Sequence, residues 1–232
     1  MAKTYKHIFF DLDHTLWDFE YNSRLTLKRV YDEYELIKKG IVDFEEFATA
    51  YNTHNEKLWK RFRKGFIKRE ELRWKRFWLT LLDFKIGDTS LAHELSSAYL
   101  EILPTQTALM PYAKEILEHC CKKYKVHLIT NGFETTQWLK MQYSGIATYF
   151  SEIITSEKSN SMKPYPEIFE YALKTTGALR EESIMIGDAL DIDVLGASGA
   201  GWDQVYFNPG KATHNRKPTY EVQGLNELLY IL

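Results

Sequence analysis

The sequence predicts an α/β fold, in which a parallel sheet is covered by helices and a helical segment is inserted after the first strand. Two observations lead to this prediction. From Pro111 onward, short apolar segments typical of strands alternate with segments of helical periodicity, the order found in parallel sheets. The apolar run Ile8–Phe10 predicts one more buried strand, but about ninety residues of helical pattern separate it from the others.

Length, composition and charge limit the kinds of protein that this chain can be. A chain of 232 residues that is 44% hydrophobic can form a large α/β domain with a sizeable insertion. The formal net charge of −2 gives no overall attraction to nucleic acid or membrane, and no apolar run is long enough to span a bilayer. We expect a cytoplasmic protein, because no apolar signal segment precedes the first strand. The adjacent Cys120 and Cys121 lack zinc-ligand spacing and favour reduced thiols in a helix.

The insertion, residues 17–107, is predicted to contain four helices. Asp43 is the expected N-cap of the second helix, with Glu46 three residues later as its capping partner. Apolar residues at helical spacing place the four helices over 21–36, 43–65, 68–84 and from 88 or 90 to just before Pro104.

The remaining residues, 1–16 and 108–232, are predicted to form the α/β core. Pro164 suits the first turn of its helix, because proline is favoured there. Strands are predicted over 125–130, 152–155, 183–187 and 204–207, and helices over 112–123, 135–143, 164–176, 191–200 and from about 225.

Two carboxylates follow the first strand. Asp11 and Asp13 are separated by one residue, and a chain that curls beyond a strand end can aim both at one point. Acids at the carboxyl end of a parallel strand lie where open α/β sheets bind ligands. The alternative is a polar turn in which one of them caps a helix, and it is the better interpretation unless the chain supplies a phosphate site and further metal ligands.

Two later segments could bind phosphate. Thr130-Asn131-Gly132 ends a predicted strand, and its hydroxyl and backbone N–H groups suit phosphate oxygens, although such residues also form ordinary strand-to-helix turns. Lys163 stands at the positive end of a predicted helix, where a cation does not stabilise the helix. It therefore fits better facing an anion, although a solvated lysine would be the default if this segment stood alone.

Further acids follow the strand that ends at Gly187. Asp188 occupies the same place after its strand as Asp11 does, and two such carboxylates with water and phosphate oxygens suit Mg²⁺. Asp191 and Asp193 could instead cap the next helix, and for Asp191 we prefer the capping interpretation.

Together these segments resemble the haloacid dehalogenase superfamily, whose members are mostly phosphatases. Its four motifs match Asp11-x-Asp13-x-Thr15, Thr130, Lys163-Pro164 and Gly187-Asp188-x-x-x-x-Asp193, in the right order on the right elements. The helical insertion looks like the helical cap of the first subclass, on a Rossmann-like core. Thr130-Asn131-Gly132-Phe133 and the first motif are most similar to the pyrimidine 5′-nucleotidase members. Ser159–Met162 and Tyr165 depart from the usual residues around the third motif.

The resemblance implies roles for these residues. Asp11 would be the nucleophile that forms an aspartyl-phosphate, and Asp13 the acid and base. Mg²⁺ would be held by Asp11, Asp188 and the backbone carbonyl of Asp13. The phosphoryl group would be bound by Thr130, Asn131, Gly132 and Lys163. Asp193 and Thr15 would hold the metal- and phosphate-binding residues in place without contacting the substrate.

The expected substrate is a small phosphate ester, a nucleoside 5′-monophosphate, acted on by a monomer or weak homo-oligomer. A sugar phosphate or phosphoglycolate is the first alternative. A 2-haloacid dehalogenase is the second, disfavoured because its family pattern replaces Asp13.

Residues 57–76, which mix basic and aromatic side chains, leave open a nucleic-acid or partner-binding module. Two amphipathic helices with solvated basic faces are the preferred interpretation, and a third is that these side chains line the inner face of the cap.

Overall fold

The computed structural model describes residues 4–232 and confirms the α/β fold. Its sheet has six strands in the order β3-β2-β1-β4-β5-β6, and every neighbouring pair is parallel. The first strand of the chain is therefore central, which is possible because the others return through crossover connections. The strands are β1 (His7–Phe10), β2 (Lys125–Thr130), β3 (Glu152–Thr155), β4 (Ser183–Gly187), β5 (Asp203–Phe207) and β6 (Tyr220–Val222).

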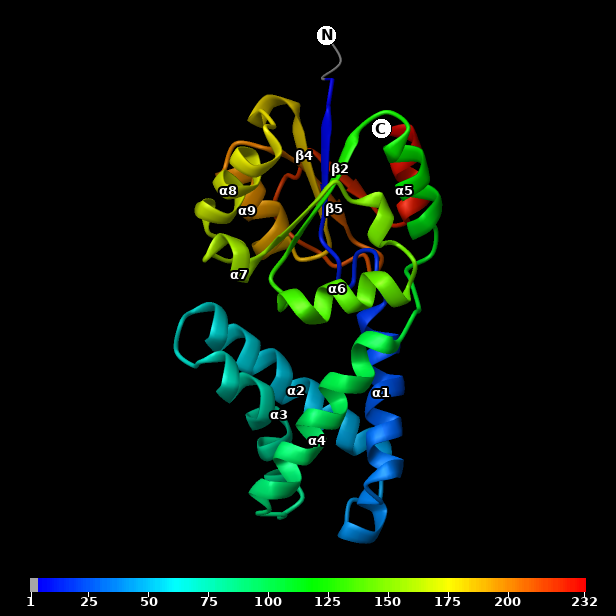
Figure 1. Cartoon of the computed structure of the whole chain (residues 1–232), viewed down its shortest axis with the longest axis vertical. Coiled ribbons are helices and arrows are strands. Elements are labelled where there is room, and N and C mark those ends of the chain that lie inside the picture. The colour runs from blue at the N-terminus through cyan, green and yellow to red at the C-terminus, as the bar shows by residue number, and fades with distance from the viewer. Residues whose placement is uncertain (1–3) are drawn as a thin grey trace. The chain divides into compact units, whose positions relative to one another are not determined.

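Helices cover both faces of this sheet. In Figure 1, α8 (Pro166–Thr176) and α9 (Leu195–Gly199) lie on one side, and α5 (Ala113–Cys121) lies with the C-terminal 3-10 helix Leu225–Tyr230 on the other. Covering both faces explains why β1 and β4 are buried at every position, the pattern expected of a parallel sheet. Two more helices follow strand ends, α6 (Glu134–Tyr143) after β2 and α7 (Ser156–Ser159) after β3.

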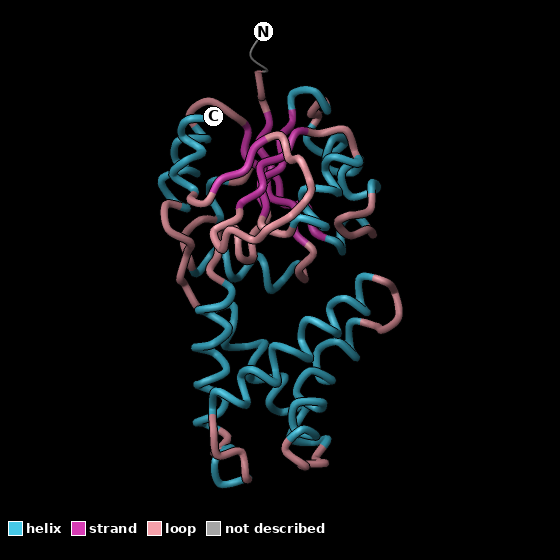
Figure 2. The backbone as a smooth tube through the Cα atoms, turned by 180° about the vertical axis from the view of Figure 1, so that it is seen from behind, coloured by secondary structure: helices cyan, strands magenta, loops and turns pink. Residues whose placement is uncertain are grey.

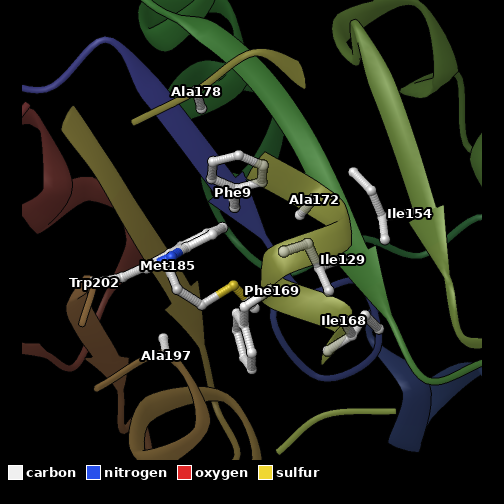
Figure 3. Packing of buried hydrophobic residues seen from close by; sticks show 10 residues of the cluster. All are labelled: Phe9, Ile129, Ile154, Ile168, Phe169, Ala172, Ala178, Met185, Ala197 and Trp202. Carbon is white, nitrogen blue, oxygen red and sulfur yellow. The ribbon is translucent and has the colours of Figure 1, made fainter. Parts of the chain in front are cut away.

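A compact core lies between the sheet and the helices α8 and α9. Figure 3 shows Phe9 from β1 and Met185 from β4 packed with side chains of these helices, and the Phe9 and Trp202 ring centroids are 4.6 Å apart. Burial of this size holds the strands in one register, since a shift of one residue would turn each strand's side chains to the other face. The cluster consists of Phe9, Ile129, Ile154, Ile168, Phe169, Ala172, Ala178, Met185, Ala197 and Trp202.

Residues 20–106 form a second compact unit, while the chain up to Phe19 and from Thr107 to Leu232 forms the α/β unit. Figure 2 shows that the second unit is built of helices and loops. The helical region between β1 and β2 contains α1 (Phe19–Glu33), α2 (Phe44–Arg63), α3 (Arg69–Asp83) and α4 (Thr89–Ile102). The Asp43 carboxylate accepts the Glu45 N–H at 2.6 Å, so the predicted N-cap of α2 is confirmed.

The interior of the helical unit is aromatic and contains a buried arginine. The Tyr51 ring packs on Phe77 and Tyr99, with centroids 4.8 and 5.2 Å away. Arg76 lies beside two of these rings and donates from Nη1 to Asn55 Oδ1 at 3.0 Å. The predicted solvated basic face is therefore only partly right, because Arg76 is a core residue. Exposed basic residues in this stretch are Lys57, Lys60, Arg61, Lys64 and Lys68.

The structure departs from the predicted elements where turns compete with regular structure. The predicted helix over 21–36 stops at Glu33, because Glu35 adopts a left-handed conformation with φ of 48° and a separate 3-10 turn follows. The last helix is 3-10 in form, and β6 and α7 were not predicted, since each is only a few residues long. Among residues 4–232, no helix combines the length and apolar character that crossing a bilayer requires.

Two histidines pair inside the sheet, on strands β1 and β2. His7 Nδ1 lies 3.0 Å from His127 Nε2, the two rings stack, and the His127 ring also stacks on Phe9. Burial lowers the pKa of both imidazoles, and that of His127 falls to about 4, assisted by the nearby His7 and Lys125. The folded protein therefore favours the neutral form of both rings.

This shift predicts acid sensitivity. A histidine whose folded pKa lies below its unfolded value stabilises the fold above the unfolded pKa, and this contribution is lost as the pH falls from about 6.5 to about 4. For His127 the loss is about 2 kcal/mol at pH 5. We expect His127→Gln to lose less unfolding free energy than the unmodified protein between pH 7 and pH 5, as measured by urea denaturation. His93→Gln, at an exposed site, is the control, and equal losses in both variants would contradict the prediction.

Candidate active site

Three neighbouring strands end at one edge of the sheet, next to residues that the sequence singled out. Asp11 follows β1, Thr130 is the last residue of β2, and Asp188 follows β4. β1 lies between β2 and β4, and the Asp11 N–H continues the ladder by donating to the Ile186 carbonyl at 2.9 Å. Because ligands bind beyond the carboxyl ends of parallel strands, this edge is the candidate site.

The Lys163 ammonium lies at the centre of this edge. Its Nζ is 2.5 Å from Asp11 Oδ1 and 2.7 Å from Asp193 Oδ1, and it donates to the Ile129 carbonyl at 2.7 Å. The Lys163 side chain is 1% exposed, so it depends on these partners for the solvation it has lost. Two of these contacts are hydrogen bonds, to Asp11 and to the Ile129 carbonyl, and the contact with Asp193 is an ion pair. The lysine thus faces anions, as its unfavourable place before a helix predicted.

Asp193 is held by the turn that follows β4. A π-helical turn, Leu190–Val194, precedes α9, and Asp193 Oδ2 accepts the Ala189 N–H at 3.0 Å. The carboxylate packs directly on Gly187, where a Cβ atom would lie 2.4 Å from Oδ2. The capping interpretation of Asp191 was wrong, because Ala189 occupies the N-cap position and Asp191 is exposed within the turn.

Asp188 is oriented by Thr15. The Thr15 hydroxyl donates to Asp188 Oδ1 at 3.1 Å and accepts the Asp188 N–H at 3.1 Å, so one side chain fixes both the carboxylate and its backbone. Burial and the neighbouring Asp193 raise the pKa of Asp188 to about 6, against an opposing contribution from His14. Thr15 is fully buried, and its supporting role stays a prediction.

The residues present fit a divalent cation. Carboxylate oxygens of Asp11, Asp188 and Asp193 all lie within 4.8 Å of one another. Burial raises the pKa of Asp11 well above its usual range, and Asp193 and Asp188 add to the shift while Lys163 opposes it. Burial alone would lower the pKa of Lys163, but the facing Asp11 and Asp193 outweigh it and raise that pKa. Three carboxylates face one ammonium, which leaves an excess of two negative charges that a divalent ion would balance.

Asp13 is held by two residues that sequence reasoning missed. Lys140 Nζ lies 2.6 Å from Asp13 Oδ1, and Gln137 Nε2 donates to Asp13 Oδ2 at 3.0 Å. Gln137 Nε2 also donates to Thr130 Oγ1 at 2.7 Å. Both residues lie on α6, three positions apart, and their burial on a predicted amphipathic helix was the one signal that could have marked them. The Asp13 side chain is thus not among the three carboxylates that fit the cation.

Asn131 connects the second and third motifs. Its Nδ2 donates to the Lys163 carbonyl at 2.9 Å, and its Oδ1 accepts the Lys163 N–H at 2.8 Å. The side chain therefore positions Lys163, and the residue's own backbone N–H is what could face a phosphate. The Gly132 N–H donates to Thr130 Oγ1 at 3.1 Å, and a Cβ atom at Gly132 would lie 2.4 Å from the Gln137 side chain.

Comparison with known proteins places this geometry in a family context. A family model of haloacid dehalogenase-like hydrolases matches residues 5–201. Pyrimidine 5′-nucleotidase PynA of Streptococcus pneumoniae is 30% identical over 97% of this chain and 94% of its own. Glyceraldehyde 3-phosphate phosphatase of Pyrococcus abyssi is 30% identical over 89% and 82%, respectively. The crystal structure of YfnB from Bacillus subtilis, bound to magnesium, superposes with a TM-score of 0.90 at 28% identity, covering 99% of both chains.

The contact between Gly187 and Asp193 predicts that a single methyl group added at Gly187 lowers the stability of the fold. In Gly187→Ala the new Cβ would displace the Asp193 carboxylate and with it an anchor of Lys163. We expect a loss of about 1–3 kcal/mol in unfolding free energy by urea denaturation. Gly199→Ala, where nothing lies within 4 Å of the new atom, is the matched control and should change stability by less than about 0.5 kcal/mol. Equal effects in the two variants would show that Asp193 is not tightly packed.

Proposed function

The chain belongs to the haloacid dehalogenase-like hydrolases, and from this membership we propose that it is a Mg²⁺-dependent phosphomonoester hydrolase. The observation that carries the proposal is the convergence of the Asp11, Asp188 and Asp193 carboxylates within 4.8 Å of one another, with Asp11 and Asp193 paired to the buried Lys163 ammonium. The reaction would pass through an aspartyl-phosphate on Asp11. The excess of negative charge fits a cation, and the ammonium and hydroxyl groups at the same edge fit the anionic phosphoryl group.

The two acids of the first motif have separate tasks in this proposal. Asp11 Oδ1 is bound to Lys163, which leaves the second carboxylate oxygen to attack phosphorus. As that O–P bond forms, the bond from phosphorus to the leaving oxygen breaks, and Asp13 supplies the proton that this oxygen needs. Asp13 then takes a proton from the water that hydrolyses the aspartyl-phosphate.

Phosphoryl binding falls to the residues around these acids. Thr130, Lys163 and the backbone N–H of Asn131 are proposed to hold the phosphoryl oxygens, while the Gly132 N–H donates to Thr130 Oγ1 and acts through that hydroxyl. Mg²⁺, when held by Asp11, Asp188 and the Asp13 backbone carbonyl, would offset negative charge on the phosphoryl group. Asp193 and Thr15 support this arrangement through Lys163 and Asp188.

For the substrate we propose a nucleoside 5′-monophosphate. Two features support this choice, the Thr130-Asn131-Gly132-Phe133 segment and the likeness to the pyrimidine 5′-nucleotidase PynA. A sugar phosphate, such as the triose phosphate named for the Pyrococcus relative, is the second candidate. That relative has the same sequence identity to this chain, 30%, as PynA. Phosphoglycolate belongs to the same alternative.

Two other activities fit less well. A halide leaves without a proton, so a 2-haloacid dehalogenase has no need for the carboxylate that this chain holds at Asp13 with Lys140 and Gln137. A nucleic-acid or partner-binding module would not require three converging carboxylates.

The domain roles belong to the same proposal. Residues 17–107 would act as a cap on the core formed by 1–16 and 108–232, and the division of the helical unit at residues 20–106 is compatible with that assignment. A cap would exclude water during phosphoryl transfer. A monomer or weak homo-oligomer, acting in the cytoplasm, stays a prediction.

Phosphate release from a panel of esters tests the proposal directly. The panel would contain nucleoside 5′-monophosphates, triose and hexose phosphates, phosphoglycolate and p-nitrophenyl phosphate, each with Mg²⁺ and with a chelator. We expect Mg²⁺-dependent release that is fastest with a nucleotide. Halide release from a haloacid, with no phosphate released from any ester, would overturn the phosphatase assignment.

Asp11→Asn should remove turnover while the fold is kept. The amide has the size of the carboxylate but is a far weaker nucleophile, so we expect the rate of phosphate release to fall by about 10³-fold or more. Circular dichroism and thermal unfolding would show that the variant is folded. Asp191→Asn, an exposed acid near the site, is the control, and near-normal activity of Asp11→Asn would refute the nucleophile assignment.

A further inference from the structure

Helix α6 presents two buried polar side chains to the candidate site. Gln137 and Lys140 are both almost fully buried, and neither was marked by a motif. Their amide and ammonium groups reach Asp13 from one side, at 3.0 Å to Oδ2 and 2.6 Å to Oδ1. Both carboxylate oxygens of Asp13 are therefore fixed by donors from a single helix.

Gln137 also determines whether the Thr130 hydroxyl donates or accepts its remaining hydrogen bond. Thr130 Oγ1 accepts the Gln137 Nε2–H at 2.7 Å and the Gly132 N–H at 3.1 Å. A hydroxyl oxygen has two lone pairs, so these two bonds use its whole acceptor capacity. The remaining O–H can then act only as a donor, the orientation that an anionic phosphoryl oxygen requires.

Lys140 is itself held in place. Its ammonium lies 4.4 Å from the Trp17 ring centroid and 5.3 Å from that of Phe19, in addition to its ion pair with Asp13. Cation–π contacts of this kind add an attraction to the ion pair and favour this position of the lysine. The Asp13 carboxylate is consequently bound to a fixed point and not to a mobile surface charge.

We propose that Gln137 and Lys140 are positioning residues, Gln137 setting Thr130 as a donor to the phosphoryl group and Lys140 setting the place of the Asp13 carboxylate. This inference rests on the proposed phosphatase function and extends it to α6. It assigns the two residues different main effects. Gln137 contacts both Thr130 and Asp13, but Asp13 keeps its ion pair with Lys140 when Gln137 is replaced, so the principal loss falls on the Thr130 contact to the phosphoryl group.

The test compares Gln137→Met and Lys140→Met with matched controls on exposed sites, Gln142→Met on the same helix and Lys122→Met. Each protein is assayed in Mg²⁺ with the nucleoside 5′-monophosphate preferred in the panel above and with p-nitrophenyl phosphate. The nitrophenolate leaves without a proton, so its stopped-flow burst reports phosphoryl transfer that does not depend on Asp13 as an acid. Thermal unfolding of every variant measures loss of structure separately.

For Lys140→Met we expect kcat on the nucleotide to fall about 10²-fold, with KM changed less than about threefold, because misplacement of the acid affects the chemical step. The rate constant of the nitrophenolate burst should decrease by a factor at least about tenfold smaller than the decrease in kcat on the nucleotide. For Gln137→Met we expect KM for the nucleotide and the inhibition constant of inorganic phosphate to rise together by about tenfold.

The outcomes separate this inference from the function on which it rests. Equal losses on both substrates in Lys140→Met, or an unchanged inhibition constant in Gln137→Met, would mean that α6 holds these residues for stability alone and would overturn the inference. Variants as active as the controls would overturn it as well. An unmodified protein that releases phosphate from no ester would instead refute the proposed function, and the inference with it.

Discussion

The arrangement at the edge of the sheet depends on the solvation of one buried charge. Lys163 has almost no access to water, so its ammonium must find acceptors within the protein. It finds them on Asp11 after β1, on the Ile129 carbonyl of β2, and on Asp193 beyond β4. A single side chain thereby joins three strand ends, and breaking one contact would leave a charge without compensation.

This requirement explains residues whose roles are otherwise obscure. Asn131 binds both the N–H and the carbonyl of Lys163, so the lysine is anchored at its backbone as well as at its tip. Gly187 has no side chain because the Asp193 carboxylate occupies that volume. Thr15 binds both the carboxylate and the N–H of Asp188, so that residue is also anchored twice. Lys163, Asp188 and Asp193 are thus each held by more than one contact.

Much of this architecture could be predicted from the sequence, because the pattern of apolar residues sets the strand and helix order. The acids after the first and fourth strands were singled out by their position together with the later phosphate and acid motifs, and the α/β fold with a helical insertion is confirmed. Gln137 and Lys140 were not found, because a periodic pattern shows which face of a helix is buried but not that a polar residue on it meets an acid far away in sequence. Asp191 was misassigned because a π-helical turn moved the helix start, and no residue type marks such a turn.

The strand order also bears on how the chain acquires its structure. Ile8 of β1 pairs with Val126 and with Ile184, so the strand that leads to Asp11 is made first but pairs with strands that lie more than a hundred residues later in the chain. Contacts between such distant segments form slowly, because a long loop must be closed before they contribute. The helical segment that intervenes is dominated by contacts between consecutive helices, which form quickly. During synthesis, therefore, β1 emerges long before β2 and β4, and the carboxylates of Asp11 and Asp188 can come together only after β4 has been made.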